Sequence, residues 1–368
     1  GSAGTAVITM NHAGVWTDSR YFLQAEMQMA NSEFQLHKLN VQGSPEYADW
    51  LVEHLGSHKV VGFDAHVMPL GLVNMLQATF DEAGISVKTD FEPFDTIWQD
   101  RPALSEASVF ELDVTFAGAS RAEKIARMRD EMRKHKAEYY LVTALDDIAW
   151  LLNLRGRDIE CNPVFISYVL FSPEKVYLFI DKNKVDASLT DKLQSDNIFI
   201  KDYEAIHHYV AEINAESSIL ISPASISYGL YQQIKCRDII QKDSPIMLAK
   251  SIKNKVEQGH IKNAMIKDGR ALTHFFMWLE DALKQGKTPT EYELSRKLIV
   301  FRSQQEGYYG ESFDAIIGYR GNGAIIHYKP EKDTSVPVLP ERVLLVDSGG
   351  QYTDGTTDIT RTIALSEV

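Results

Sequence analysis

Residues 343–362 read VLLVDSGGQYTDGTTDITRT, and this stretch carries the strongest structural signal in the chain. Its apolar beginning, Val343–Val346, predicts a strand that ends in the carboxylate of Asp347. The Asp-Gly dipeptide at 354–355 predicts a tight turn, after which a returning strand carries a second carboxylate, Asp358. The stretch therefore predicts a β-hairpin with one acidic side chain on each arm.

The pairing of the two arms decides how the carboxylates are arranged. If the turn is centred on residues 354–355, Asp347 lies opposite Thr362, and Asp358 is an even number of residues from Thr362. Both aspartates then point to the same face of the hairpin, because side chains alternate along a strand. The same pairing leaves the two aspartates about 13 Å apart along the ladder, at ~3.3 Å per residue. A bulge or a wider loop has to bring them together.

Two carboxylates on one face of a β-ribbon are suited to a hard divalent cation. Aspartate oxygens are ligands that Mn²⁺, Mg²⁺ and Co²⁺ prefer, and strands hold such ligands rigidly. Asp347 and Asp358 are therefore candidate metal ligands. Acidic residues are also common beside turns. The spacing alone leaves open a second interpretation, in which Asp347 caps the end of its strand and Asp358 faces solvent.

The remainder of the chain begins with two regions of similar make-up. Residues 1–118 and 119–250 each alternate short strands with helices, a pattern typical of α/β domains. The boundary near residue 118 follows a stretch without helical periodicity, 102–118, and precedes a capping box formed by Ser120 and Glu123. The pattern predicts two successive α/β domains.

The last region, residues 251–368, has a different pattern. One helical pattern runs over 254–285, and a second helix is expected to begin where Thr290 and Glu293 form another capping box. The strands expected after it are Phe313–Ile317, Ala324–Tyr328, Arg342–Val346 and Thr357–Ala364. Two helices followed by antiparallel strands predict the beginning of an α+β domain. A hairpin at the end of a chain exposes an edge strand, so this domain looks cut short.

Composition excludes several classes of function. A formal net charge of −13 argues against nucleic-acid binding, which uses a basic surface. No apolar run reaches the length of a membrane helix, and the first residues do not resemble a signal peptide. The 11 histidines include no HExxH motif and no zinc-finger spacing. The chain has 2 cysteines, a number that favours a reducing compartment.

Several further motifs are distributed along the chain in a consistent order. They are WTDSRYFLQ at 16–24, Trp98 with Arg101-Pro102, TALDDIAWLLNLRG at 143–156, NPVF at 162–165 and GAIIHY at 323–328. Together with VDSGGQYTDGTTDITRT they extend over nearly the whole sequence. Through these motifs the chain resembles aminopeptidase P (Xaa-Pro aminopeptidase) of the pita-bread metallopeptidase family.

The resemblance implies a domain organisation. Two creatinase-like N-terminal α/β domains, 1–118 and 119–250, are followed by the first part of a pita-bread catalytic domain, 251–368. The family pattern begins before the first residue and continues after Val368, so the chain looks truncated at both ends. A homodimer in the cytoplasm is also implied.

The resemblance further implies a metal-dependent hydrolase. In the family two metal ions, usually Mn²⁺, are held by two Asp, one His and two Glu, and a hydroxide bridging them attacks the carbonyl before proline. Asp347 and Asp358 fall on the first two ligand positions, and the other three are expected after Val368. The substrates implied are peptides with proline at the second position. This span alone is expected to be inactive and the parent protein active.

Two further site residues follow from the resemblance. His327 matches a histidine that lies over the substrate, and it is expected to act in catalysis and in substrate binding. Arg20 matches an arginine that contacts substrate, plausibly that of a neighbouring subunit. On the sequence alone, His327 also fits a core histidine on a sheet, and Arg20 fits a surface arginine paired with Asp18.

Other functions remain open at this stage. A prolidase shares the metal ligands but cleaves dipeptides and typically has a single N-terminal domain. A creatinase uses no metal, and some pita-bread proteins are binding modules without catalysis. The two N-terminal domains and the retained aspartates favour an aminopeptidase, and a His and two Glu after Val368 would distinguish an enzyme from a binding module.

Overall fold

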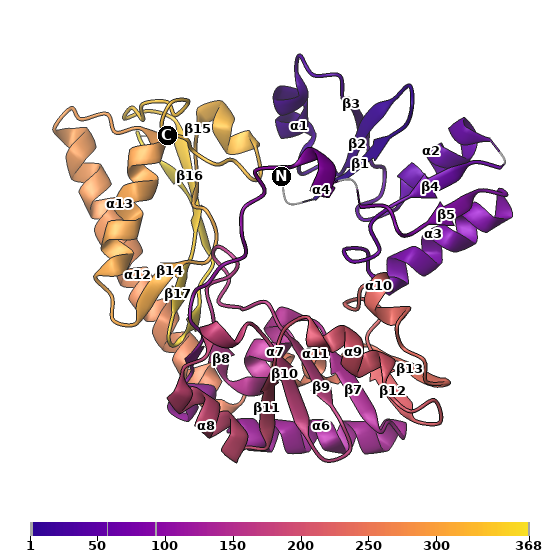
Figure 1. Cartoon of the computed structure of the whole chain (residues 1–368). Helices are drawn as coiled ribbons and strands as arrows, with labels where there is room; N and C mark the ends of the chain where they lie inside the picture. The colour runs from indigo at the N-terminus through magenta and orange to yellow at the C-terminus, as the bar shows by residue number, and fades with distance from the viewer. Residues whose placement is uncertain (1–2, 57, 93, 367–368) are drawn as a thin grey trace. The chain divides into compact units, whose positions relative to one another are not determined.

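The computed structural model describes residues 3–56, 58–92 and 94–366 (Figure 1). Residues 1 and 368, where the first predicted domain begins and the last one ends, lie outside the described ranges. The chain forms two compact units, one of residues 1–54 with 259–368 and one of residues 55–258. None of the helices in the described ranges combines the length and the apolar character that crossing a lipid bilayer requires.

The unit of residues 55–258 is built around a six-stranded mixed sheet in the order β11-β10-β9-β7-β12-β13. The strands are β7 (Tyr139–Val142), β9 (Tyr168–Phe171), β10 (Val176–Phe179), β11 (Ile198–Lys201), β12 (Ser218–Ile221) and β13 (Asp238–Gln241). Strands β9 and β10 form an antiparallel hairpin, whereas β12 is parallel to both β7 and β13. Residues 172–175 form the connection of this hairpin.

Helices cover both faces of this sheet, because both faces of its strands are apolar. In β7, Tyr140 and Val142 contribute to one buried core, and Leu141 contributes to the other. The first core is covered by α6 (Arg121–His135), α7 (Leu145–Leu152), α8 (Ala187–Ser195) and α11 (Pro245–Ser251). The second is covered by α9 (Ala205–Ala211), α10 (Tyr228–Tyr231) and the start of α3 (Leu70–Glu82). Figure 1 shows α6 lying along one face of the sheet.

Helix α6 begins at the predicted capping box. The Ser120 hydroxyl accepts a hydrogen bond from the Glu123 amide, and Glu123 Oε2 accepts one from the Ser120 amide at 2.7 Å. Two of the amide groups that lack partners at a helix start are thereby satisfied. The shorter elements of this unit are β4 (Val60–Gly62), β5 (Ser86–Lys88), α4 (Phe94–Ile97), β6 (Phe110–Glu111), α5 (Val114–Ala117), β8 (Leu154–Arg155) and η1 (Lys182–Lys184).

The N-terminal part of the other unit holds a three-stranded sheet in the order β1-β2-β3. Its elements are β1 (Thr5–Ile8), β2 (Ala13–Thr17), α1 (Phe22–Met29), β3 (Gln35–Lys38) and α2 (Glu46–Leu55). Strands β1 and β2 are antiparallel, whereas β2 and β3 are parallel with α1 between them in the sequence. This arrangement agrees with the alternation of strands and helices that the sequence predicts.

The C-terminal part of the same unit begins with α12 (Lys255–Lys284) and α13 (Glu291–Ser303), which lie side by side (Figure 1). Two three-stranded antiparallel sheets follow. One contains β15 (Ile316–Tyr319), β16 (Val343–Ser348) and β19 (Ile359–Ala364), and the other contains β14 (Tyr308–Glu311), β17 (Gly350–Tyr352) and β18 (Gly355–Thr356). The core residues Phe275, Leu298 and Val346 come from α12, α13 and β16. The predicted long helix and the capping box of Thr290 are both confirmed.

The strand predicted over Ala324–Tyr328 is wrong. A short 3-10 helix, η2 (Arg320–Ala324), occupies its beginning, and a turn closed by a hydrogen bond from the Tyr328 amide to the Ile325 carbonyl occupies the rest. The side chains of Asn322 and Tyr328 both donate to the carboxylate of Glu291 on α13, at 3.1 and 2.8 Å. This tertiary contact holds the segment in a compact fold, although its Ile-Ile pair favours a strand.

Candidate metal centre

Asp347 lies in β16 and Asp358 immediately precedes β19, and these two arms pair in a register that differs from the predicted one. Asp347 of β16 is paired with Thr360 of β19, not with Thr362. The turn is centred one residue earlier than predicted, since Tyr352 pairs with Gly355, and each residue's partner therefore shifts by two. Asp358 is still an even number of residues from the partner of Asp347, so the expectation of a shared face agrees with the observed pairing.

The observed register also removes the separation problem. Asp358 is diagonal to Asp347, two residues from its direct partner, and diagonal pairs have Cβ atoms ~7–8 Å apart. Carboxylates at that separation can approach one another across the face. The bulge or wider loop that the predicted register required is therefore unnecessary.

The β-ribbon of residues 343–364 passes from one sheet to the other at Gly349, close to both aspartates in the sequence. Strand β16 ends at residue 348 and β17 begins at 350, while β18 ends at 356 and β19 begins at 359. A Cβ atom on Gly349 would lie 1.9 Å from the Thr357 carbonyl oxygen, a distance that no side chain tolerates. The two arms can approach this closely only because residue 349 is glycine.

The carboxylates of Asp347 and Asp358 interact with each other. Partial desolvation, followed by the negative charge of Asp347 and a hydrogen bond to it, raises the pKa of Asp358. Asp347 Oδ1 also accepts a hydrogen bond from the Thr360 hydroxyl at 2.7 Å. Asp347 is half-buried and Asp358 is exposed, so the face that carries them is accessible. The interpretation in which Asp358 faces solvent is right about its exposure, but it does not account for the pairing.

The carboxylates of Asp347 and Asp358 suit a divalent cation and would supply some of its ligands. Two acidic groups held side by side repel each other, and a cation between them would relieve that repulsion. Their oxygens are the donors that hard divalent cations take. Among the residues that the structure describes, no group of three or more His, Cys, Asp or Glu is placed to hold a metal ion. The two aspartates are therefore candidates for two of the ligands of such a cation.

Arg20 forms a bidentate ion pair with Asp18. Its Nε and Nη2 donate to Asp18 Oδ1 and Oδ2, each at 2.8 Å. The Arg20 hydrogen bond lowers the pKa of Asp18 from 3.8 to about 2, against a smaller opposing effect of burial. The surface pairing that the sequence leaves open for Arg20 is thus present, and its side chain remains 36% exposed.

His327 lies in the turn that follows η2, not on a sheet. Its ring contacts the ring of Tyr21, with centroids 4.8 Å apart, and its charge contributes to the lowered pKa of Asp18. The Nδ1 atom of His327 is buried and has no hydrogen-bond partner in the described part of the chain. The neighbour of Arg20 in the sequence, Tyr21, is therefore in contact with His327 within one compact unit. No hydrogen bond from His327 to Asp347 or Asp358 is present among the described residues.

Sequence reasoning missed a polar network behind the ribbon. The Asp268–Arg302 pair, both fully buried, connects to the ribbon through the hydroxyls of Ser348 and Thr357. The sequence contains a sign of this network, because Asp268 and Arg302 each interrupt the apolar stripe of their helix.

A second polar cluster fixes the tip of the ribbon. Asp354 accepts hydrogen bonds from His260, Asn263 and Lys267 of α12. Burial opposes the charge of Asp354, but these three donors hold its pKa below the ordinary value. Asp354, the acidic residue of the Asp-Gly dipeptide, is therefore held against α12. This contact is present in the turn whose centre differs from the predicted one.

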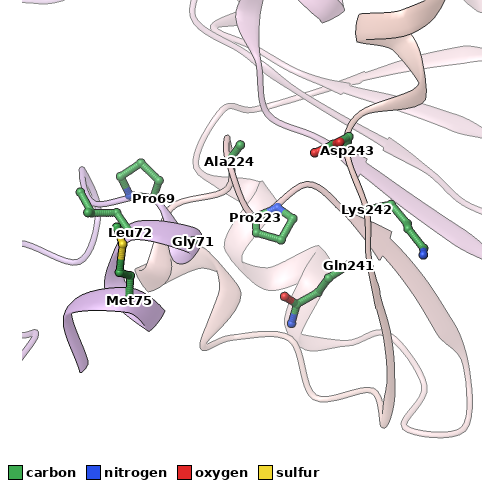
Figure 2. Close-up of a pocket in the computed structure, with 9 residues that line it drawn as sticks. All are labelled: Pro69, Gly71, Leu72, Met75, Pro223, Ala224, Gln241, Lys242 and Asp243. Atoms are coloured by element: carbon green, nitrogen blue, oxygen red, sulfur yellow. The ribbon is translucent and has the colours of Figure 1, made fainter. Parts of the chain in front are cut away.

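A separate hollow of about 730 Å³ lies within the unit of residues 55–258 (Figure 2). Its lining comes from three segments. The first is Pro69 with Gly71, Leu72 and Met75 at the start of α3, the second is Pro223 and Ala224, and the third is Gln241, Lys242 and Asp243 at the end of β13. Figure 2 shows the polar side chains on the last of these segments only. The hollow is lined by none of the predicted site residues.

Comparison with known families accounts for the chain from end to end. The model of the creatinase/prolidase N-terminal domain matches residues 1–97, and a second model with that description matches residues 100–257. The model of metallopeptidase family M24 matches residues 259–368, which include both aspartates. Residues 259–368 are thus similar to metallopeptidase family M24. The expected fold class, two creatinase-like domains followed by this catalytic-type domain, is confirmed.

Curated relatives are similar to the chain over nearly its whole length. Xaa-Pro aminopeptidase 1 of Dictyostelium discoideum is 40% identical over 99% of the chain, and probable Xaa-Pro aminopeptidase P of Laccaria bicolor is 40% identical over 98%. The chain spans 59% and 57% of the lengths of these two relatives. The resemblance to aminopeptidase P that its motifs indicate is confirmed.

A solved structure is similar in the same way. The X-prolyl aminopeptidase from Caenorhabditis elegans is described as a cytosolic enzyme with a di-nuclear active site. It matches 99% of the present chain with a TM-score of 0.93 and 32% sequence identity, and 61% of its own length is covered. The similarity includes the segment that carries Asp347 and Asp358.

Proposed function

We propose that the protein is an Xaa-Pro aminopeptidase, which hydrolyses the peptide bond between an N-terminal residue and a following proline. The observation that carries the proposal is the interaction of Asp347 in β16 with Asp358, which immediately precedes β19, on an accessible face of the hairpin. Two curated relatives with Xaa-Pro aminopeptidase names and the M24 match support the same activity. Peptides with proline at the second position are the proposed substrates.

Asp347 and Asp358 are the proposed metal ligands in this chain. Their shared face and mutual contact suit them to hold divalent cations, of which we propose two, with Mn²⁺ as the physiological ion. The di-nuclear site of the nematode enzyme supports the number. Such cations, when bound, supply Lewis-acid polarisation of a carbonyl and lower the pKa of water. The Thr360 hydroxyl, which donates to Asp347 Oδ1, restricts the rotation of that carboxylate.

His327 and Arg20 are the proposed substrate-binding residues. The buried Nδ1 of His327 has no partner among the described residues, so a hydrogen bond to a substrate would satisfy it. His327 is also proposed as a catalytic residue, because a ring nitrogen donating a hydrogen bond can stabilise charge that develops on a carbonyl oxygen. Arg20, held by Asp18, presents a fixed positive charge to a carboxylate or backbone carbonyl of a peptide.

The organisation of the whole protein is part of the proposal. We propose three domains, 1–118, 119–250 and 251–368, and the ranges matched by the three family models support this division. A homodimer follows from the family resemblance. A cytoplasmic location is supported by the description of the nematode enzyme as cytosolic.

Hydrolysis of an Xaa-Pro-Yaa tripeptide by the full-length gene product in Mn²⁺ tests the activity. We expect release of the N-terminal residue, little cleavage of the matched Xaa-Ala-Yaa peptide and loss of activity in the Asp358→Asn variant. The 368-residue chain, in which the described residues offer only a partial donor set, is assayed alongside and is expected to be much less active. Cleavage of Xaa-Pro dipeptides without cleavage of the tripeptide would contradict the proposal and favour a dipeptidase.

A further inference from the structure

A fully buried ion pair lies behind the face that carries the two aspartates. Arg302 Nε and Nη2 donate to Asp268 Oδ1 and Oδ2, at 2.6 and 3.3 Å, and both side chains have 0% exposure. Asp268 belongs to α12 and Arg302 to α13, so the pair joins the two helices that support the sheet. Two buried charges in such a place require further partners, because burial without them is costly.

The first further partner is the residue that follows Asp347. Arg302 Nη2 also donates to the Ser348 hydroxyl at 2.9 Å, and Ser348 has 0% exposure. Successive side chains of a strand point to opposite faces, so anchoring Ser348 on the core face directs Asp347 to the accessible face. Arg302 thereby fixes the end of β16 at its metal-ligand position.

The second further partner is the residue that precedes Asp358. The Thr357 hydroxyl donates to Asp268 Oδ2 at 2.8 Å and accepts a hydrogen bond from the Gly350 amide at 2.9 Å. Thr357 is 1% exposed, whereas its neighbour Asp358, which immediately precedes β19, is exposed on the opposite side. The same ion pair therefore fixes the immediate neighbour of each candidate ligand.

The remaining side of Arg302 is held by a second carboxylate. Arg302 Nη1 donates to Glu311 Oε2 at 2.8 Å, and the Tyr308 hydroxyl donates to Glu311 Oε1 at 2.7 Å. Although burial opposes the charge, hydrogen bonding to Asp268 and the negative charge of Glu311 raise the pKa of Arg302. The guanidinium is thus held along three directions by groups on α12, β14 and β16. A point charge on a flexible chain, such as a lysine ammonium, could not reproduce this geometry.

We propose that Asp268 and Arg302 are positioning residues that set the separation and direction of the Asp347 and Asp358 carboxylates. The proposal rests on the proposed function insofar as those carboxylates bind divalent cations. The ion pair does not touch the cations. It acts through Ser348 on one strand of the ribbon and Thr357 on the other.

The simpler alternative is that the pair only stabilises the packing of α12 against α13. The two accounts differ in what happens when a single hydroxyl link is removed and the ion pair is left intact. If the pair positions the ligands, loss of the Thr357 link alters the cation site. If the pair only stabilises the helices, the loss alters stability alone.

The test uses two substitutions at Thr357 and one control in the other unit. Thr357→Val keeps the volume and removes the hydroxyl, whereas Thr357→Ser keeps the hydroxyl. The control is Asp158→Asn, which breaks the buried ion pair with Lys184, whose Nζ lies 2.6 Å from Asp158 Oδ2. For each variant of the protein, three quantities are measured: the melting temperature, Mn²⁺ affinity from the electron paramagnetic resonance of free Mn²⁺, and amide hydrogen exchange over residues 343–364.

We expect Thr357→Val to weaken Mn²⁺ binding on the order of 10-fold, the lower end of effects seen when groups that orient metal ligands are removed. It is also expected to speed amide exchange at the ribbon, while Thr357→Ser restores both quantities. The control is expected to lower the melting temperature without changing either. Ser348→Ala provides the same comparison on the other strand if the valine variant does not fold.

The result that overturns the proposal is a Thr357→Val variant with unchanged Mn²⁺ affinity and unchanged exchange at the ribbon. Failure of the proposed function gives a different pattern. In that case the unmodified protein binds no Mn²⁺, yet the valine variant still exchanges faster than the serine variant. The proposed metal site would then be wrong, whereas the positioning of the two strands by the ion pair would stand.

Discussion

The two compact units each bury an ion pair, and the pairs differ in construction. Asp268 accepts hydrogen bonds from both arms of the Arg302 fork and from two hydroxyls of the ribbon. Asp158 accepts hydrogen bonds from Lys184 and from one backbone amide, both on Oδ2, and its buried Oδ1 has no partner in the described part of the chain. The Asp268–Arg302 pair is hydrogen-bonded to both arms of the ribbon. The Asp158–Lys184 pair joins the segment around residue 158 to η1.

Burial alone therefore does not determine the role of an ion pair. Arginine stays protonated in proteins and presents several donors in a rigid fork, so it can hold several groups at once. Lysine carries a single ammonium on a flexible stem and can release its proton when its partner is removed. The geometry of the cation therefore decides whether a buried pair can fix the direction of its neighbours. Four predictions test this comparison.

The largest effect is expected from Asp268→Asn, which leaves the Arg302 guanidinium buried without its main counter-charge. The free energy of unfolding, measured with urea, should fall by about 3–5 kcal/mol. The matched change Asp158→Asn should cost about 1–3 kcal/mol, because Lys184 can become neutral. Equal losses in the two variants would show that the two pairs are energetically equivalent and would break the comparison.

The next effect concerns the glycine at which the ribbon changes sheets. Gly349→Ala places a Cβ atom against the Thr357 carbonyl, and the resulting displacement should cost about 1–3 kcal/mol. It should also weaken Mn²⁺ binding, because the two arms must separate. Gly269→Ala is the control: it lies in α12 with nothing within 4 Å of the added Cβ and should stabilise by up to about 1 kcal/mol. A stabilised Gly349→Ala variant would contradict the close approach of the arms.

The capping boxes should give smaller effects that are equal in the two units. Ser120→Ala removes the cap of α6, and Thr290→Ala removes the cap of α13. Each should lower the free energy of unfolding by about 1 kcal/mol without changing Mn²⁺ affinity. A loss of Mn²⁺ affinity in the Thr290 variant alone would show that the start of α13, as well as Arg302 near its end, sets the cation site.

These caps also show which features the sequence predicts well. All the information for each box lies within four consecutive residues, Ser120–Glu123 and Thr290–Glu293, and both helices begin where expected. The shared face of Asp347 and Asp358 was predictable for a similar reason, because alternation along a strand is a local rule. Local rules therefore gave the elements and the candidate ligands.

Contacts between distant residues decided the rest. The turn of the ribbon is centred one residue earlier than predicted, which shifts the cross-strand pairing by two residues, and Asp354 in that turn contacts Lys267 of α12. The expected strand around His327 is replaced by a turn that Glu291 of α13 holds through two side chains. Neither contact leaves a signal in the segment that it reshapes.

The polar network is an intermediate case. Asp268 and Arg302 each interrupt an apolar stripe, and Arg302 continues the spacing of Leu294 and Leu298. A buried charge could therefore be predicted at each position. Its partner could not, because the two residues belong to different helices and their pairing depends on how those helices pack.

The smallest effect on stability is expected at the partly exposed pair of Arg20 and Asp18, where water screens the charges. The pKa of Asp18 lies at about 2, below its ordinary 3.8, so the folded state binds a proton less readily than the unfolded state. The stabilisation by this carboxylate is thus present above about pH 4 and is lost as the pH falls toward 2. Arg20→Ala should raise the pKa of Asp18 toward 3.8 in an NMR titration. An unchanged value would show that Arg20 does not hold the carboxylate in solution.

Mn²⁺ binding by the protein and by its Asp347→Asn and Asp358→Asn variants tests whether the two carboxylates hold the cation together. We expect the unmodified protein to bind the ion and either single substitution to abolish most of the binding, because the two carboxylates act as one site. Equal Mn²⁺ affinity in all three proteins would contradict it.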